Sequence, residues 1–227
     1  MTSFDELSQR ASALGLAVRG AFLPNAGELD QALPGVSAGT VVLLGFTGGL
    51  QWEQFRDSAE AHDGEPNPLD RWSRRLIGSL AREFGAVDVY PSGSPTLPFQ
   101  RLASRAEPVH QSPIGLLIHP RWGLWHAYRG ALVLEERIEL PRLEPKAHPC
   151  TTCAAKPCLS SCPVGAFSGQ SYDLKACVDH VLSEAGSDCR ENGCRARRAC
   201  PVGSEFAYGP EQARFHMQAF LRAARSR

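Results

Sequence analysis

Apolar residues recur at two different periods in the first half of the chain. In residues 4–14 and 69–84 they stand three or four positions apart, which predicts two helices, the second of about four turns. Gly15 ends the first helix, and a strand is predicted directly after it at 16–22. An unbroken apolar run at 40–46 predicts a buried strand.

The rest of the pattern predicts shorter elements. In chain order these are a helix at 50–59, a polar loop at 61–68, a strand at 86–90, a Ser-, Gly- and Pro-rich loop at 91–98 followed by a short helix, strands at 114–118 and 122–134, a proline-rich linker at 141–149, and a helix at 211–225. The two strands before the linker are expected to form a hairpin. This order predicts an α+β fold, with an α/β domain at 1–140 and a small, loop-rich domain at 141–227.

The composition limits the classes of function. The chain has 227 residues, of which 43% are hydrophobic, enough for one ordinary domain and a small one. Its formal net charge is zero, so no general attraction to nucleic acid or to an anionic membrane is expected. No apolar run approaches the length of a membrane span, and residues 1–10 lack the apolar region of a signal peptide. We therefore expect a cytoplasmic protein that binds neither nucleic acid nor membrane.

The cysteines carry the most specific chemistry in the sequence. All eight lie between residues 150 and 200, in two sets of four, and each set ends in the phrase Cys-Pro-Val-Gly, at 162–165 and at 200–203. Bacterial two-cluster ferredoxins have a similar pattern, in which the cysteine of each Cys-Pro pair ligates the other cluster. Two 4Fe-4S clusters, and hence electron transfer with a redox partner protein as donor, are therefore expected.

The cross-ligation rule assigns the cysteines to the two clusters. The first set of ligands is Cys150, Cys153, Cys158 and Cys200, and the second is Cys162, Cys177, Cys189 and Cys194. Two structural zinc ions are an alternative, because four-cysteine zinc sites also use short spacings. Disulfides are disfavoured in a reducing cytosol. Gaps of four residues before Cys158 and five before Cys200 depart from the commonest ferredoxin spacing and leave the cluster type and the individual ligands open.

Outside the cysteines, the most specific stretch is residues 119–130, His-Pro-Arg-Trp-Gly-Leu-Trp-His-Ala-Tyr-Arg-Gly. It resembles the core motif of the cobalamin-processing family known from methylmalonic aciduria type C with homocystinuria. The order of segments is also similar to that of epoxyqueuosine reductases and reductive dehalogenases, which the Ser-Pro-Thr-Leu phrase at 94–97 and Arg-Ala at 105–106 support. In the latter two families a cobalamin-binding, nitroreductase-like domain precedes a ferredoxin-like domain with two 4Fe-4S clusters.

This resemblance implies a nitroreductase-like α/β domain followed by a ferredoxin-like iron-sulfur domain. It further implies a corrinoid reductase or dealkylase, with cobalamin as an additional cofactor and a corrinoid small molecule as partner. The implied cofactor-binding residues are His119, Trp122, Gly123, Trp125 and Arg129, of which Arg129 matches the active-site arginine of the cobalamin-processing family. Flavin stays open as well, because the nitroreductase-like fold also serves flavin enzymes.

Each of these interpretations has a plainer alternative. Pro98 and Phe99 stand where epoxyqueuosine reductases have an acidic proton donor, so a queuosine precursor is not expected as substrate. A ferredoxin-like electron carrier or partner subunit without its own substrate is the alternative function. Structural roles compete for the implied cofactor residues and for three histidines, His110, His119 and His126. The arginines at 195, 197 and 198 are either a solvated loop or a docking patch for an acidic electron donor.

Overall fold

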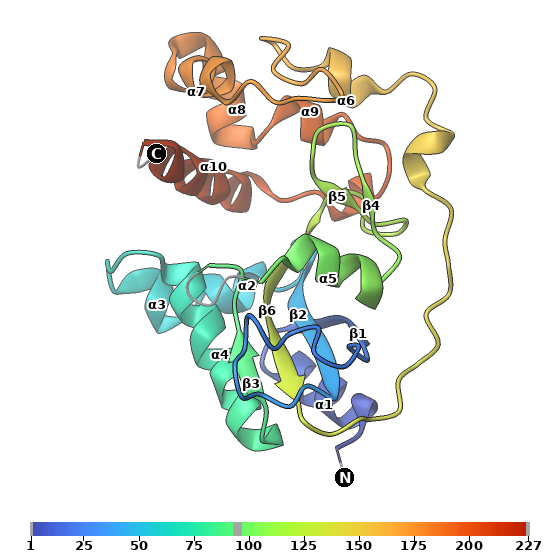
Figure 1. The fold of residues 1–227 in the computed structure, drawn as a ribbon. Helices are drawn as coiled ribbons and strands as arrows, with labels where there is room; N and C mark the ends of the chain where they lie inside the picture. Colours follow the sequence, from blue (N-terminus) through green and yellow to red (C-terminus); the bar gives the residue numbers. More distant parts are fainter. Residues whose placement is uncertain (1, 93–96, 226–227) are drawn as a thin grey trace. The chain divides into compact units, whose positions relative to one another are not determined.

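The computed structural model describes residues 2–92 and 97–225 and divides into two compact units. Unit 1 comprises Met1–Pro108 and Ala127–Pro145, and unit 2 comprises Val109–His126 and Lys146–Arg227 (Figure 1). The segment Val109–His126 therefore belongs with the cysteine-rich part of the chain, although it precedes the linker in sequence. The expected domain boundary between residues 140 and 141 stays a prediction.

Unit 1 is built on a four-stranded sheet with the strand order β1-β2-β6-β3. The strands are β1 (Ala17–Phe22), β2 (Thr40–Thr47), β3 (Val87–Val89) and β6 (His126–Leu134). The pairs β1–β2 and β3–β6 are antiparallel. Every residue of β2 is buried, as its unbroken apolar run requires of a central strand.

Among the described residues of unit 1, five helices accompany this sheet. They are α1 (Phe4–Ala13), α2 (Trp52–Arg56), α3 (Ala59–His62), α4 (Pro68–Phe84) and α5 (Phe99–Ala106). Proline at the first position starts α4, and Gly85 ends it in the left-handed conformation at φ 60°. The apolar stripe of α4 is buried, and its Trp72 packs on Phe46 of β2 and on Phe55 of α2, at ring-centroid distances of 5.7 and 5.9 Å.

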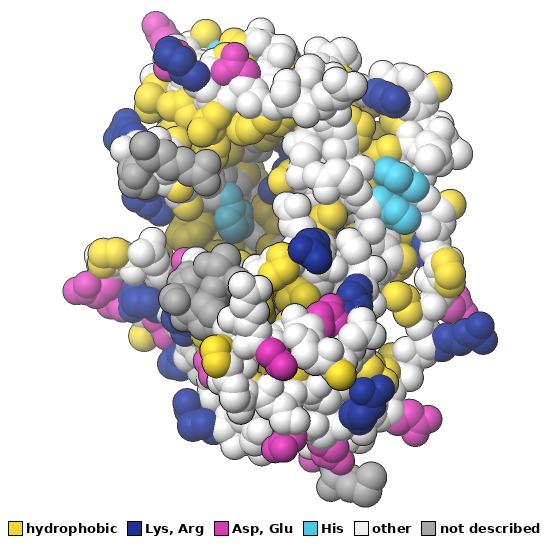
Figure 2. Space-filling model, viewed as in Figure 1, with side chains coloured by type: hydrophobic (Ala, Val, Ile, Leu, Met, Phe, Trp, Pro, Cys, Tyr) yellow, Lys and Arg dark blue, Asp and Glu magenta, His cyan; other side chains and the backbone are white. Residues whose placement is uncertain are grey.

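A buried ion pair joins three elements of unit 1. A β-bulge between Val18 and Gly20 places Arg19 at the irregular point of β1, and this arginine is only 2% exposed. Its Nη2 donates to both carboxylate oxygens of Glu107, which follows α5, at 2.9 and 3.0 Å. The hydroxyl of Tyr128 on β6 donates to the same carboxylate. Figure 2 shows acidic and basic side chains intermingled on the visible surface, whereas Arg19 and Glu107 are buried, at 2% and 7% exposed.

Apart from α7 and α10, the helices and strands of unit 2 are short. They are β4 (His110–Gln111), β5 (Leu117–Ile118), η1 (Pro149–Thr151), α6 (Pro157–Ser160), α7 (Leu174–Leu182), η2 (Glu184–Gly186), α8 (Ser187–Asn192), α9 (Arg195–Arg198), η3 (Ser204–Phe206) and α10 (Pro210–Arg225). Its two small apolar cores both contain cysteines: one includes Cys158 and Cys200, the other Cys189. The cysteine side chains are thus part of what holds unit 2 together.

Most of the predicted elements are confirmed, with three differences, one of which is that the strands expected at 114–118 and 122–134 are shorter, at Leu117–Ile118 and His126–Leu134. The helix expected at 50–59 is two short helices, α2 and α3, and α3 takes up the start of the expected loop at 61–68. The expected loop at 91–98 falls partly on residues 93–96, which lie outside the described residues. The mixed α+β class is confirmed, whereas the finer assignment to nitroreductase-like and ferredoxin-like domains stays a prediction.

The third difference is the expected hairpin between 114–118 and 122–134, which is wrong. The strand β5 pairs with β4, and β6 enters the sheet of unit 1 between β2 and β3. The physical reason is that the last five residues of β6 are all buried and apolar, so this strand needs a partner on each side. Between residues 2 and 225, as far as they are described, no helix combines the length and apolarity needed to cross a membrane.

Substituting Glu107→Ala should destabilise the protein strongly. The change leaves the buried Arg19 guanidinium without its carboxylate, which typically costs about 3–5 kcal/mol of unfolding free energy. Urea unfolding followed by circular dichroism would measure it. The matched control is Glu83→Ala, which removes the exposed pair with Arg10 in the same unit and should have a far smaller effect. Equal effects of the two substitutions would contradict a structural role for the buried pair.

Candidate cluster-binding site

Four of the eight thiols in unit 2 form a first group of neighbours. Burial raises the pKa of Cys150, and the nearby thiols of Cys200, Cys158 and Cys153 raise it further. Burial likewise raises the pKa of Cys158, and the nearby thiols of Cys200 and Cys153 raise it further. The structure therefore brings Cys200, which is 42 residues or more from the other three, into their group.

The other four thiols form a second group. Burial raises the pKa of Cys177, and Cys162 and Cys189 add to the effect. Burial also raises the pKa of Cys194, whose thiol neighbours are Cys177 and Cys189. Cys162 thus lies with the later cysteines, although only three residues separate it from Cys158 in the sequence. These two groups are the same sets that the cross-ligation rule predicts.

Each group offers four cysteine sulfurs, the donor set of a 4Fe-4S cluster and also of a four-cysteine zinc site. All eight cysteines are free thiols, so none is committed to a disulfide. Among the described residues, no three or more His, Cys, Asp or Glu side chains are placed to hold a single metal ion. A zinc ion draws its four sulfurs to about 2.3 Å from one centre, whereas a 4Fe-4S cube has one thiolate on each of its four irons and needs a wider cage. Each group supplies the four thiolates that one such cube requires.

Backbone N–H groups point at several of these sulfurs. The N–H of Ala166 donates to Sγ of Cys162 at 3.3 Å. The backbone N–H groups of Ala196 and Arg197, in helix α9, hydrogen-bond the sulfur of Cys194. The backbone N–H of Val202 hydrogen-bonds the sulfur of Cys200. Such donors favour the negatively charged thiolate, the form that binds metal.

The stretch from His119 to Trp125 forms a tight turn against the second Cys-Pro-Val-Gly phrase. His119 and Gly123 exchange two backbone hydrogen bonds of 2.9 Å, and Nδ1 of His119 accepts from the N–H groups of Arg121 and Trp122. A Cβ on Gly123 would lie 1.8 Å from the carbonyl oxygen of Val202. This turn therefore packs directly on the backbone that follows Cys200, and only glycine allows the approach.

The same contact involves the glycine at the end of the phrase. A Cβ on Gly203 would lie 2.5 Å from the carbonyl carbon of Trp122. The corresponding Gly165 of the first phrase has a similar backbone, with φ 58° against 65°, but open space around it. The ring of Trp122 also packs on Phe206 at 4.5 Å. The repeated phrase thus plays different structural roles in its two copies.

The arginines between Cys194 and Cys200 each contact other residues of unit 2. Arg197 donates two hydrogen bonds to the carbonyl oxygen of Leu124, at 2.6 and 3.1 Å, and its guanidinium lies 4.5 Å from the rings of both Trp125 and Tyr208. Arg195 and Arg198 both pair with Asp188. The segment is helix α9, not the solvated loop considered from the sequence, and Arg197 ties it to the His119–Trp125 turn.

The five residues expected to bind a cofactor are divided between the units. His119, Trp122, Gly123 and Trp125 belong to unit 2, and Arg129 belongs to unit 1. Nε of Arg129 donates to Oγ of Ser73 at 3.0 Å, and its Nη2 pairs with Asp70. Arg129 and Asp70 line a small pocket of about 180 Å³ with Arg74, Tyr90 and Tyr128 among its walls. The proposed cofactor role of all five residues stays a prediction.

The sequence analysis did not single out His148, which positions the first cysteine loop. Its Nδ1 accepts from the N–H of Cys150 at 3.2 Å, its Nε2 hydrogen-bonds the carbonyl oxygen of Gln111, and its ring stacks on His110 at 4.6 Å. The sequence signal was its place two residues before a cysteine, directly ahead of proline. Ring nitrogens of His110 and His126 hydrogen-bond backbone carbonyls of Lys146 and Leu117, a structural role for both.

No family model matches the chain, and no curated protein matches it. Solved structures, however, are similar in fold. The crystal structure of epoxyqueuosine reductase with an epoxyqueuosine-modified tRNA-Tyr stem loop has a TM-score of 0.52 at 16% identity, covering 92% of this chain and 69% of that one. Epoxyqueuosine reductase from Streptococcus thermophilus has a TM-score of 0.54 at 15% identity, covering 94% and 70%. At such identities the likeness establishes the fold alone.

These comparisons correct part of the interpretation of the sequence. They agree with the resemblance to epoxyqueuosine reductases and give no support to the cobalamin-processing family, to cobalamin or to flavin. The expectation of a corrinoid partner and no nucleic acid is contradicted, because a protein of similar fold is seen with a tRNA stem loop. The zero net charge misled here, since it averages over the surface and says nothing about a local binding site.

The contact between Gly203 and the backbone of Trp122 can be tested with a matched pair of substitutions. Gly203→Ala and Gly165→Ala both force a side chain into the left-handed conformation, at about 1–2 kcal/mol each. Gly203→Ala must in addition displace the backbone at Trp122, which should cost at least about 1 kcal/mol more. Urea unfolding followed by tryptophan fluorescence measures the difference. Equal destabilisation would show that the turn does not press on this phrase.

Proposed function

We propose that this chain is an iron-sulfur redox protein that holds two 4Fe-4S clusters in unit 2. The first would be bound by Cys150, Cys153, Cys158 and Cys200, and the second by Cys162, Cys177, Cys189 and Cys194. The observation that carries this proposal is the exchange of partners between the sets: each Cys-Pro cysteine lies with the thiols of the other set. Cross-ligation of this kind is the arrangement of two-cluster ferredoxins.

The thiols are suited to hold metal only once they lose their protons. Burial raises the pKa of Cys194 and Cys200, so both are protonated at neutral pH without metal. Metal binding must therefore release protons, and the N–H donors at these sulfurs stabilise the resulting thiolates. When bound, 4Fe-4S clusters supply one-electron transfer at potentials that the hydrogen bonds and solvent exposure tune.

An oxidoreductase role agrees with the fold. Both similar structures are reductases, and the likeness covers at least 92% of this chain. The electron acceptor is a separate question, because Pro98 and Phe99 replace the acidic proton donor expected of an epoxyqueuosine reductase. We therefore propose two candidate functions: a reductase with a different substrate, or an electron carrier.

Anaerobic reconstitution should load about eight iron atoms per chain and give a brown protein with broad visible absorbance. Cys200→Ser and Cys194→Ser should each reduce the iron content by up to half, because each removes a ligand from one cluster only. Iron and sulfide assays with visible spectra measure this. Two zinc ions per chain and no visible absorbance would contradict the proposal.

The assignment of ligands has its own control. Cys158→Ser and Cys200→Ser should alter the same cluster spectrum, although 41 residues separate the two positions in the sequence. Cys162→Ser should instead alter the spectrum that Cys194→Ser alters. If Cys158→Ser and Cys162→Ser perturbed one and the same cluster, the exchange between the sets would be wrong.

We propose RNA as a second candidate partner, which the tRNA stem loop in one structure of similar fold supports. A structured tRNA stem loop should then shift the mobility of the protein in a native gel, with affinity that falls as salt rises. A DNA hairpin of the same sequence is the control, because it lacks the 2′-hydroxyl groups that distinguish RNA. No shift at low salt, or an equal shift with the DNA hairpin, would contradict an RNA-specific site.

A further inference from the structure

A groove in unit 1 lies between helix α5 and residues 23–39, the loop that joins β1 to β2. Its volume is about 810 Å³, within the range of small-molecule sites. The helix lines it with Pro98, Arg101, Leu102 and Arg105, which stand three or four positions apart and therefore share one face of α5. The loop contributes residues 28, 29, 31 and 32. The groove therefore belongs to unit 1 alone and contains none of the cysteines.

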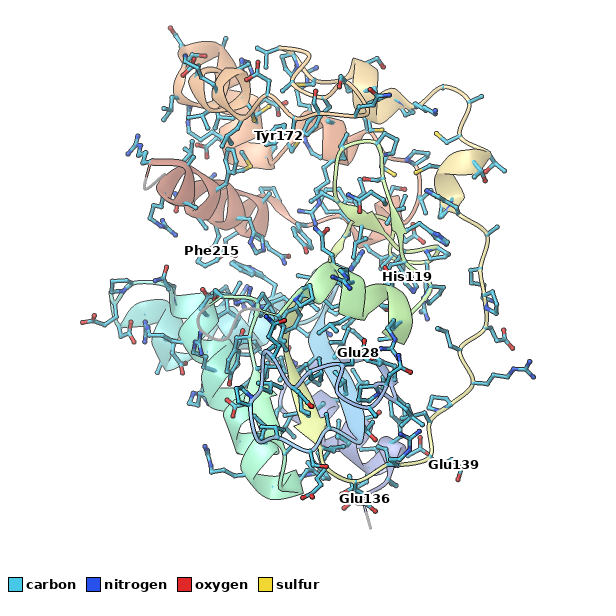
Figure 3. The ribbon with its side chains drawn as sticks, in the orientation of Figure 1. Glu28, His119, Glu136, Glu139, Tyr172 and Phe215 are labelled. Carbon is cyan, nitrogen blue, oxygen red and sulfur yellow. The ribbon has the colours of Figure 1, made fainter. Side chains whose placement is uncertain are left out.

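The loop side of the groove is held in place by hydrogen bonds and by an ion pair. Within the loop, the N–H groups of Glu28 and Ala32 each donate to the carbonyl oxygen three residues earlier, at 3.1 and 3.0 Å. Arg105 of α5 pairs with the carboxylate of Glu28, which Figure 3 labels beside this helix. Nη2 of Arg105 also donates to the carbonyl oxygen of Leu23 at 2.9 Å. The two walls are thus joined to each other, so the groove is formed without a ligand.

Apolar side chains make up much of the wall. The most buried of them are Leu29, Leu97 and Leu102, at 4%, 3% and 3% exposed. Ala32 and Pro98 are more exposed and add further apolar surface. An apolar ligand body that covers these side chains would remove them and itself from water, which favours binding.

The charges of the groove do not balance. Its charged lining residues are two arginines and one carboxylate, and Glu28 is already paired with Arg105. Arg101 is exposed, and within residues 2–92 and 97–225 it has neither a hydrogen-bond acceptor nor an ion-pair partner. A guanidinium has five N–H donors in a planar fork, whose geometry matches a carboxylate. One positive charge at the groove is therefore left for a ligand.

We infer that this groove binds a small organic carboxylate, with its apolar body against Leu29, Leu97 and Leu102 and its head on Arg101. A single carboxylate balances the single unpaired charge, whereas a neutral ligand of the same shape leaves Arg101 to water. This inference goes beyond the proposed function, because it uses no cluster and no residue of unit 2.

The test is isothermal titration calorimetry of the full chain with two probes, octanoate and 1-octanol, which share an apolar body and differ in the charge of the head. Octanoate should bind more tightly. Arg101→Gln should raise the Kd of octanoate about three- to fivefold, the range of an exposed ion pair, and leave that of 1-octanol unchanged. The matched control is Arg56→Gln, which removes an exposed arginine from α2 in the same unit and should change neither Kd.

A second variant locates the site. Ala32→Trp places a large side chain in the groove and should abolish binding of both probes, with circular dichroism to verify that the variant is folded. Absence of octanoate binding, equal affinity for the two probes, or an unaltered Kd in Arg101→Gln would overturn the inference. Binding that persists in folded Ala32→Trp would place the ligand elsewhere and overturn it as well. Iron content, measured on the same samples, tests the proposed function separately.

Discussion

The organisation of unit 2 depends on bringing Cys200 to the first three cysteines while Cys162 neighbours a later one, Cys177. Only three residues separate Cys162 from Cys158, yet their thiols belong to different groups. The helical turn of α6 ends at Ser160, and proline after Cys162 directs the chain away from the first group. The backbone after Cys200 packs on the His119–Trp125 turn, and Gly123 and Gly203 allow these two backbones to come into contact.

This constraint gives a structural meaning to residues that had suggested a cofactor pocket. His119, Trp122 and Gly123 hold a turn together or press it on the phrase after Cys200, and Arg197 clamps Leu124 and Trp125 to the helix between two cysteines. Arg129 lies instead in unit 1, where Asp70 and Ser73 satisfy it. One continuous sequence motif therefore serves two units, and its resemblance to a cofactor-binding motif did not reveal that division.

The sequence predicted the features that depend on local pattern. The stripe of α4 and the apolar run of β2 are strong periodic signals, and the two sets of cysteines follow from their spacing and the repeated Cys-Pro. The pairing of β6 was missed, because a strand's partner is decided by burial of its whole length and not by the nearest strand in sequence. His148 was missed for a related reason: it contacts the backbone of a cysteine through a hydrogen bond that no spacing rule encodes.

Two four-iron clusters are central to this interpretation: one is held by thiols from both ends of the cysteine-rich segment, and the other by the four cysteines between them. A crystal structure of the reconstituted protein, with anomalous scattering measured at the iron edge, tests it most directly. The account predicts two iron-sulfur clusters, one bound by Cys150, Cys153, Cys158 and Cys200, and the other by the remaining four cysteines. A cluster bound by the four consecutive cysteines from Cys150 to Cys162, or single zinc ions in place of iron, would contradict it.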